Sequence, residues 1–206
     1  MTRKIPAILA IILCLILATG CSRMSETAVP VKHNVIEGDV TEMKIDLPVQ
    51  TSAKAQNLTP TDTQGFVVKQ LGYVDKSKNA AGFTAFGFSP IHLDTDKVNA
   101  LTPAEKKAFA EGMEKGIIKT FTSGYVKGMN GHNSTIEHKD ITINGVDMHE
   151  YSVGYQGKDN KEHVAKTLYI PSDTEIWLVI IDYPKDDTKA AQQADKCLSS
   201  IKLVKK

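Results

Sequence analysis

Arginine is almost absent from this chain, which has only Arg3 and Arg23 among its 206 residues. The guanidinium group is the side chain best suited to a two-pronged grip on phosphate or carboxylate, so its scarcity argues against nucleotide and acidic-substrate sites of that kind. The formal net charge of +1 is also too small to give the basic surface that nucleic-acid binding requires. We therefore expect no nucleic acid among the partners of this protein.

Cysteine is scarce as well, and Cys14, Cys21 and Cys197 are the three examples. Cys14 lies in an apolar segment near the N-terminus, and Cys21 follows the end of that segment. Cys197 is the one cysteine in the rest of the sequence. A single thiol cannot form a disulfide framework, so stability must come from an ordinary hydrophobic core. Cys197 lies on the apolar stripe of a helical pattern, which favours a small buried hydrophobe over a nucleophile.

The apolar run near the N-terminus, Ala7 to Ala18, is shorter than the roughly 20 residues that a transmembrane helix needs. Arg3 and Lys4 give it a positively charged start, and small residues lead from it to Cys21. This combination is typical of a signal peptide. We therefore expect residues 1–20 to be a signal that is removed from the mature protein.

The end of this segment, Leu17-Ala18-Thr19-Gly20-Cys21, resembles the bacterial lipoprotein signal (the lipobox), although Ala18 stands where that family prefers leucine. The resemblance implies cleavage between Gly20 and Cys21 after a diacylglyceryl group has been attached to the Cys21 thiol. Each buried CH₂ contributes about 0.8 kcal/mol, so two or more acyl chains would anchor the chain stably to membrane lipid. The alternative is an ordinary secretory signal cleaved near Ala18, which would leave Cys21 as a plain thiol. The lipoprotein interpretation places the protein in the cell envelope, on the extracytoplasmic side of a bacterial membrane.

Without a 20-residue signal, 186 residues would remain, which is enough for one well-buried domain. The signal contains Arg3 and Lys4 but no acidic residue, so 23 basic and 24 acidic side chains would remain, a net charge of −1. Residues 21–40 are largely polar and lack periodicity, which predicts a lipidated cysteine followed by a flexible tether. Residues 41–206 are expected to form a single domain.

The chain from residue 41 onward reads as strands with two helices. A capping box with proline at the first helical position, Thr102-Pro103-Ala104-Glu105, predicts where the first helix begins. Asn144-Gly145 is a strong signal for a two-residue hairpin turn. The last expected strand is apolar on both faces and should be central in its sheet. The expected strands are 41–47, 66–74, 82–88, 134–143, 146–155, 162–170 and 175–183, with a closing helix at 188–201 and loops at 49–64 and 124–133.

This order of elements predicts an α+β domain. The long meander, the doubly apolar last strand, the following PKDD, the terminal amphipathic helix and the final IKLVKK resemble the PsbP-like family, which includes DcrB-like lipoproteins. The similarity covers roughly residues 43–203. It implies an antiparallel sheet of about six strands sandwiched between helices, and an accessory or assembly role without known catalysis. It assigns no site residue to this chain.

We expect no metal site, no cofactor and no catalytic residue. Pairing across the predicted hairpin turn sets His138 opposite Tyr151 and His149 opposite Asp140, with His163 on the next strand. No two of these histidines face each other in that register, whereas metal ligands must converge on one point. No serine lies in the strand-turn-helix context that activates a nucleophile.

The glycine-rich segment Gly124–Asn133 is the best candidate for a partner-binding surface. It combines Tyr125, Met129 and His132 as possible partner-binding residues, and functional contacts concentrate on loops that a rigid scaffold holds. The alternative is that the segment merely connects a helix to the next strand.

The function that we expect is that of a membrane-anchored envelope lipoprotein, acting as a non-catalytic binding or assembly module with an envelope protein partner. One alternative is a small-ligand carrier with an apolar pocket between the sheet and the helix that begins at Thr102. Another is an envelope hydrolase whose active site cannot be recognised from the sequence. A large pocket would favour the carrier, and converging polar groups with shifted pKa values would favour the hydrolase.

Overall fold

The computed structural model describes residues 29–59, 65–77, 79–158 and 160–206. The predicted signal, its cleavage site between Gly20 and Cys21 and the lipidation site at Cys21 lie outside these described residues. In the part of the chain that is described, no helix has the length and apolar character needed to cross a membrane.

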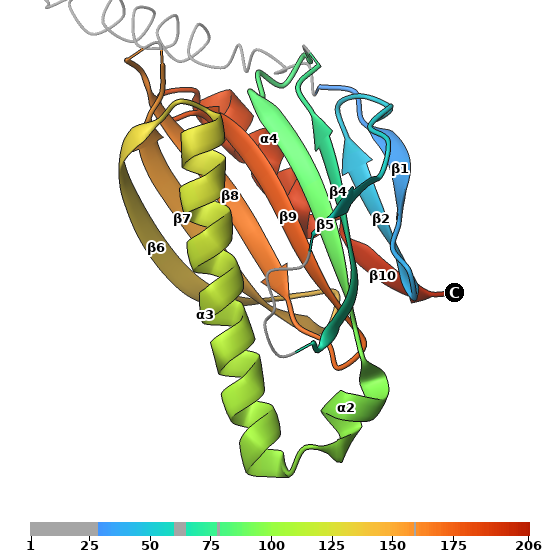
Figure 1. Ribbon diagram of the computed structural model, residues 1–206. Coiled ribbons are helices and arrows are strands. Elements are labelled where there is room, and N and C mark those ends of the chain that lie inside the picture. The colour runs from blue at the N-terminus through green and yellow to red at the C-terminus, as the bar shows by residue number, and fades with distance from the viewer. Residues whose placement is uncertain (1–28, 60–64, 78, 159) are drawn as a thin grey trace, which may run out of the picture.

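A seven-stranded antiparallel sheet forms the middle of the molecule (Figure 1). Its strands follow the order β3-β4-β5-β9-β8-β7-β6, so the doubly apolar strand β9 is central, as predicted. The α+β class and the antiparallel sheet are confirmed, with seven strands rather than about six. The strands are β3 (Gln56–Leu58), β4 (Val67–Asp75), β5 (Ala85–Leu93), β6 (His132–Ile143), β7 (Val146–Gln156), β8 (Glu162–Ile170) and β9 (Glu175–Pro184).

A three-stranded sheet and the closing helix α4 (Thr188–Ser199) cover one face of the large sheet (Figure 1). The small sheet has the order β1 (Lys32–Glu37), β2 (Thr41–Leu47) and β10 (Lys202–Lys205). Residues 32–37 were expected in the tether, but they pair with β2, and Ile36 packs in the main core. The folded part of the chain therefore begins before residue 41. Strand β1 was not expected from the sequence because pairing with β2 holds it in place, whereas its own residue pattern does not indicate a strand.

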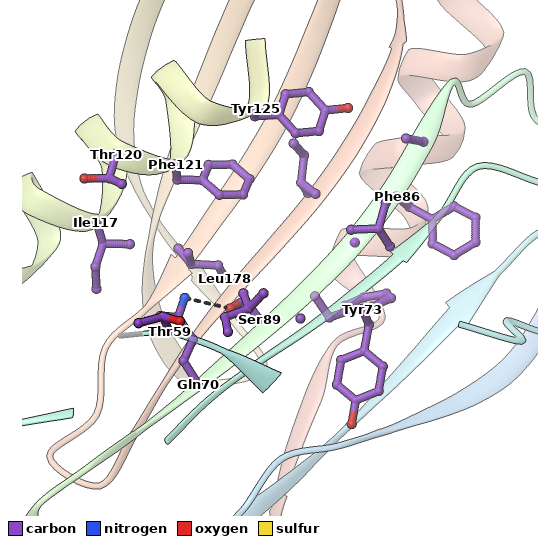
Figure 2. A pocket seen from close by; sticks show the side chains of 17 residues that line it. Thr59, Gln70, Tyr73, Phe86, Ser89, Ile117, Thr120, Phe121, Tyr125 and Leu178 are labelled. Carbon is purple, nitrogen blue, oxygen red and sulfur yellow. Dashed lines mark hydrogen bonds between the residues drawn. The ribbon is translucent and has the colours of Figure 1, made fainter. Parts of the chain in front are cut away.

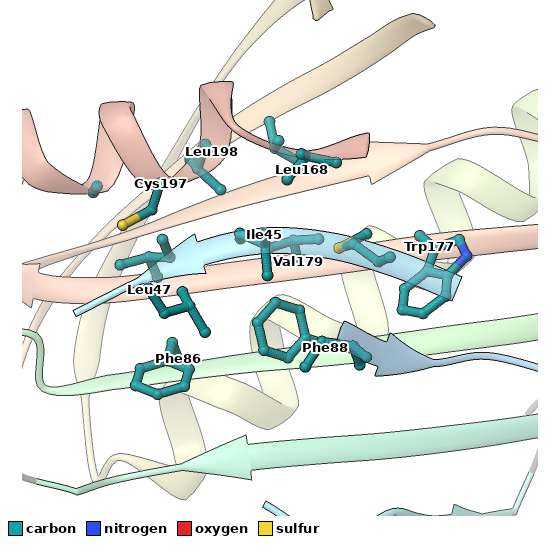
Figure 3. Packing of buried hydrophobic residues seen from close by; sticks show 14 of the residues in the cluster. Ile45, Leu47, Phe86, Phe88, Leu168, Trp177, Val179, Cys197 and Leu198 are labelled. Atoms are coloured by element: carbon teal, nitrogen blue, oxygen red, sulfur yellow. The ribbon is translucent and has the colours of Figure 1, made fainter. Parts of the chain in front are cut away.

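The main hydrophobic core lies between these two layers (Figure 3). Ile45 of β2 and Leu198 of α4 pack there with Phe88, Trp177 and other side chains of the large sheet. Cys197 belongs to the same core with 1% of its surface exposed, and burial raises the pKa of its thiol to about 11. The interpretation of Cys197 as a buried hydrophobe is therefore confirmed, because a buried, protonated thiol is a poor nucleophile.

Glu175 connects the turn between β1 and β2 to the start of the central strand. Its carboxylate accepts hydrogen bonds from the main-chain N–H groups of Asp39 at 2.5 Å and Thr41 at 2.8 Å, and from the Thr41 hydroxyl at 2.5 Å. Glu175 is only 1% exposed, and a buried carboxylate is tolerated where several donors replace its water. These bonds fix the position of the small sheet relative to the large one.

Helix α3 (Pro103–Gly128) lies across the opposite face of the large sheet (Figure 1). The predicted capping box is present: the Thr102 N–H donates to Glu105 Oε2 at 2.8 Å, and the Glu105 N–H donates to Thr102 Oγ1 at 3.4 Å. The short helix α2 (Thr95–Ala100), which the sequence pattern did not indicate, precedes it and is capped by Asp94. The sheet is thus covered on both faces by helices, as the family resemblance implied.

The predicted loop Gly124–Asn133 is wrong over residues 124–128, which continue α3. Glycine in a helix interior costs about 1 kcal/mol relative to alanine, but Val126 is buried against the sheet, and that burial offsets the cost. The helix ends where Asn130 adopts the left-handed conformation (φ 54°) and the Gly131 N–H donates to Val126 O at 2.8 Å. This is a Schellman motif, and the stop signal is Asn130-Gly131 rather than the first glycine.

Candidate functional site

A cavity of about 380 Å³ lies between α3 and the large sheet, over β4, β5 and β9 (Figure 2). Figure 2 shows Ile117 and Phe121 of α3 on one side of the cavity, across from Gln70 and Ser89 of the strands. The volume falls within the range of about 300–1,000 Å³ that is usual for small-molecule sites. The other lining residues are Leu58, Thr59, Gly72, Tyr73, Val74, Ala85, Phe86, Gly87, Phe88, Thr120, Tyr125, Leu178 and Ile180.

Small residues on α3 leave open space beside the cavity. One row of α3 consists of Gly112, Gly116 and Thr120 at every fourth position, and such residues follow one another along one side of a helix. Apart from the adjacent residues and the helix's own main chain, no atom lies within 4 Å of where a Cβ would stand on either glycine. These two glycines line a second hollow of about 160 Å³, which shares Thr120, Ile117 and Gln70 with the main cavity. The two hollows therefore adjoin along α3.

Two glycines on the strands deepen the floor of the main cavity. A Cβ on Gly72 would lie 2.9 Å from Leu58 Cδ1, and a Cβ on Gly87 would lie 2.8 Å from the main-chain oxygen of Tyr73. Real Cβ atoms do not approach other atoms so closely, so a larger residue at position 87 would require the main chain to shift, whereas one at position 72 would displace the Leu58 side chain. The floor is thus made of main chain, with Leu178 and Ile180 of β9 beside it.

The described lining is largely apolar. Among the described residues that line the cavity, none is an aspartate, glutamate, lysine, arginine or histidine. The two ionisable side chains are tyrosines whose hydroxyls bond outside the cavity: Tyr73 donates to the main-chain oxygen of Glu37 on the small-sheet side, and Tyr125 donates to Asp182. Burial raises the pKa of Tyr73, and burial together with the Asp182 carboxylate raises the pKa of Tyr125. Both phenols are neutral at neutral pH. The site therefore suits an uncharged, largely apolar ligand.

Gln70 and Ser89 form a polar corner in this lining. The Ser89 hydroxyl donates to the main-chain oxygen of Leu71 at 2.8 Å and accepts from Gln70 Nε2 at 3.3 Å. Neither partner is a base, so nothing here activates Ser89 as a nucleophile. The corner can instead orient a ligand through one or two hydrogen bonds.

A buried polar cluster adjoins the cavity behind Tyr125. Asp182 is fully buried, and its Oδ2 accepts hydrogen bonds from the Tyr125 hydroxyl at 2.6 Å and from the Tyr155 hydroxyl. Burial raises the pKa of Asp182 above its ordinary value, and the two tyrosines and His163 oppose that shift. The cluster holds Tyr125 in a fixed position at the end of the cavity.

The same cluster contains a histidine and a hydroxyl, but they are not arranged as a catalytic relay. Thr84 Oγ1 lies 3.4 Å from His163 Nδ1, and Asp182 Oδ1 lies 3.3 Å from the same nitrogen. A nucleophile–histidine–carboxylate relay requires the hydroxyl and the carboxylate on different ring nitrogens. The cluster therefore gives no support to the hydrolase alternative.

The three residues predicted to bind a partner are placed differently from one another. Tyr125 lies on α3, bonded to Asp182, and Met129 packs beside it against the sheet. Only His132 is exposed, at the start of β6. The three do not project together from a loop, because α3 extends through Gly128. Their role in partner binding stays a prediction.

The predicted hairpin register is confirmed, with His138 opposite Tyr151 and His149 opposite Asp140. The inference that no two histidines meet was wrong, however, because diagonal neighbours on one face of an antiparallel pair are also within reach of large side chains. The ring centroids of His138 and His149 are 5.6 Å apart. His163 lies elsewhere, opposite Tyr155.

Sequence reasoning anticipated a pocket between sheet and helix only as an alternative, and it named none of the lining residues. One signal was available in the sequence. Glycine or threonine occurs at every fourth position from Gly112 to Gly128, which indicates one side of a helix that carries only small side chains. Whether that side faces the sheet or solvent depends on tertiary packing, which the pattern does not contain.

No family model and no curated protein matches this chain. It is similar to the solution structure of cyanobacterial PsbP (CyanoP) from Synechocystis, with a TM-score of 0.49 and 9% identity over 87% of this chain and 96% of that one. CyanoP bears the name of the family that the order of elements resembles.

Two crystal structures are similar at a TM-score of 0.37. LpqN of Mycobacterium tuberculosis, described as involved in cell envelope biogenesis, shares 16% identity over 84% of this chain and 91% of its own. PA94 of Pseudomonas aeruginosa, a protein of unknown function, shares 10% identity over 82% of this chain and 94% of its own. With all three TM-scores below 0.5, none of these likenesses supports an inference about function.

Proposed function

We propose that this protein is a membrane-anchored, non-catalytic binding protein that holds an uncharged apolar ligand between α3 and the large sheet. The observation that carries the proposal is the cavity of about 380 Å³, whose described lining contains no charged residue. A lining of this kind, with a few polar groups that set orientation, is typical of small-molecule binding sites. Of the functions expected from the sequence, the small-ligand carrier fits this site best.

The chemistry of the lining separates binding from catalysis. General acid–base catalysis needs a group with a pKa near the working pH within reach of the substrate. The described lining has Ser89 without a base, and its two tyrosines have raised pKa values and hydroxyls that already donate to Glu37 and Asp182. A neutral ligand can be held there by apolar contact and oriented by Gln70, but no lining group is poised to move a proton.

The neutral fluorescent probe N-phenyl-1-naphthylamine tests this proposal. We expect saturable binding to the full chain with one site, because a dry apolar cavity enhances the emission of the probe. Thr120→Trp adds a large ring at a position that lines the cavity, and it should raise the Kd at least about tenfold, equivalent to 1.4 kcal/mol. Fluorescence titration of each variant measures the effect.

Lys119→Trp is the matched control, since it adds the same ring on the same helix at an exposed position that does not line the cavity. It should bind the probe as the unmodified chain does. An anionic probe such as 8-anilinonaphthalene-1-sulfonate should bind more weakly, because none of the described lining residues is cationic. Equal loss of binding in both tryptophan variants would contradict the assignment of the site.

Attachment to the membrane through acylated Cys21 is the second part of the proposal, and an envelope protein partner remains part of it. The support is the small-small-cysteine ending of the N-terminal segment. Cys21→Ser should abolish labelling by a fatty-acid probe, because the sulfur that carries the acyl group is gone. It should also leave the precursor uncleaved or release the protein from the membrane. Labelling of the variant equal to that of the original chain would refute the anchor.

A further inference from the structure

A second cluster of side chains with coordinating atoms lies on the α3 side of the large sheet, away from the cavity. It consists of Glu114 on α3, His138 on β6 and His149 on β7. One coordinating atom from each residue lies within 4.8 Å of one from each of the others. None of these residues lines the main cavity, so the cluster is a separate feature of the molecule.

The hairpin register and the course of α3 together create this cluster. His138, Asp140, His149 and Tyr151 share one face of the β6–β7 hairpin, and the two imidazoles are diagonal neighbours. Glu114 reaches the same point from the helix above: its Oε1 contacts His149 Nδ1 and accepts a hydrogen bond from the Tyr151 hydroxyl at 2.5 Å. Three elements that are separate in sequence thus bring two imidazoles and one carboxylate together.

Aromatic contacts fix the orientation of both imidazole rings. His138 stacks on Tyr151 with ring centroids 4.7 Å apart, and His149 packs against the buried Tyr169 at 5.9 Å. Asp140 Oδ1 lies 3.2 Å from His138 Nε2, which adds a carboxylate beside the second ring. Ligands that are held in place before the ion arrives lose little conformational entropy when they bind it, and outer partners of this kind support metal sites.

The donor set matches a particular class of ion. Two imidazoles and one carboxylate, with a further position left open, form a set found in zinc sites, and imidazole is a preferred ligand of divalent transition metals. Calcium and magnesium prefer oxygen ligands throughout, which this cluster does not supply. The exposed fractions of the Glu114, His149 and His138 side chains are 16%, 30% and 45%, so an ion reaches them directly from solvent.

We propose that Glu114, His138 and His149 bind a divalent transition metal ion of the zinc class. The ion lies between His149 and Glu114, and His138 supplies the third ligand. Binding there joins the edge hairpin β6–β7 to α3 through coordinate bonds. The site thereby reinforces the side of the sheet where β6 pairs with a single strand.

Titration calorimetry with Zn²⁺ tests the proposal on the full chain, in mild detergent, with a reducing agent that does not bind metal and without a histidine tag. We expect one equivalent to bind the original chain. His138→Ala and His149→Ala should each weaken binding at least about tenfold, since losing even an outer partner of a metal ligand costs 10–100-fold. Zn²⁺ should also raise the thermal transition of the original chain, because an ion that binds only the folded state stabilises it.

His33→Ala is the matched control, because His33 also contacts a carboxylate, Asp46 Oδ1 at 2.9 Å, but belongs to no group of three among the described residues. It should bind Zn²⁺ like the original chain. The thermal transitions without metal show whether each variant is folded. Zn²⁺ affinity that is unchanged in folded His138→Ala and His149→Ala variants, or lowered equally by His33→Ala, would overturn the proposal.

Discussion

Replacing Trp177 with alanine should lower the free energy of unfolding by about 3–5 kcal/mol, the usual cost of truncating a buried aromatic side chain. Trp177 is fully buried in the core between the large sheet and the small one, and its indole N–H donates to Thr41 Oγ1 at 2.8 Å. Truncation would remove apolar contacts in both layers and one hydrogen bond between them. Domains commonly have only 5–15 kcal/mol of stability in total, so urea unfolding should detect the change easily.

Trp177→Phe separates packing from hydrogen bonding. It keeps an aromatic ring in the core but removes the donor to Thr41, so it should cost clearly less than the alanine variant. Val68→Ala gives an exposed control, since Val68 on β4 is 58% exposed. An alanine variant at position 177 that unfolds like the original chain would show that the small sheet does not depend on this residue.

Replacing Asp182 with alanine is the second change with a large expected effect, a loss of about 3 kcal/mol. The hydroxyls of Tyr125 and Tyr155 would both lose their acceptor, and a buried donor without a partner costs about 1–3 kcal/mol. Because Tyr125 also lines the cavity, binding of the neutral probe should weaken in the same variant. Urea unfolding and fluorescence titration measure the two effects.

Asp182→Asn tests the pH dependence that follows from the raised pKa of Asp182. The folded state holds the proton of this carboxyl more tightly than the unfolded state, whose pKa is near 3.8. The stability that this group contributes is therefore complete below pH 3.8 and is lost as the pH rises through the folded pKa. Asparagine does not titrate, so the stability of Asp182→Asn relative to the original chain should rise with pH across this window.

Urea unfolding of both proteins between about pH 3 and pH 8 tests this prediction, and the lower limit is set by the ordinary pKa of aspartate. His163 faces Asp182 and is present in both proteins, so its titration must be compared as well. If the stability of Asp182→Asn relative to the original chain instead falls as the pH rises, the hydrogen bonds and His163 lower the pKa of Asp182 by more than burial raises it. The sign of the slope is thus the result to examine.

Local signals in the sequence determined most of the elements. The capping box at Thr102 and Glu105 and the hairpin turn at Asn144-Gly145 depend on bonds between residues a few positions apart, so they form wherever the chain carries them. The unbroken apolar run of β9 likewise placed that strand in the middle of the sheet, because only a central strand buries both faces. The α+β class followed from the order of these elements.

Tertiary contacts decided the rest. β1 is exposed along one face and is a strand because β2 pairs with it, and residues 124–128 are helical because Val126 and its neighbours are buried on the sheet. In both places the stabilising free energy comes from contacts with residues distant in sequence. This stabilisation outweighs a local conformational preference that is weak or favours another structure. A propensity argument has no access to that contribution.

The candidate sites depend even more on distant contacts. The cavity forms only because α3 lies over β4, β5 and β9, and the two histidines come together only because the strand pair brings diagonal neighbours beneath Glu114. The residue types were visible in the sequence, as was the pairing of the hairpin. The packing direction of a helix against a sheet is set by the whole core, so the sequence by itself determined most of the elements and the tertiary structure alone decided what they enclose.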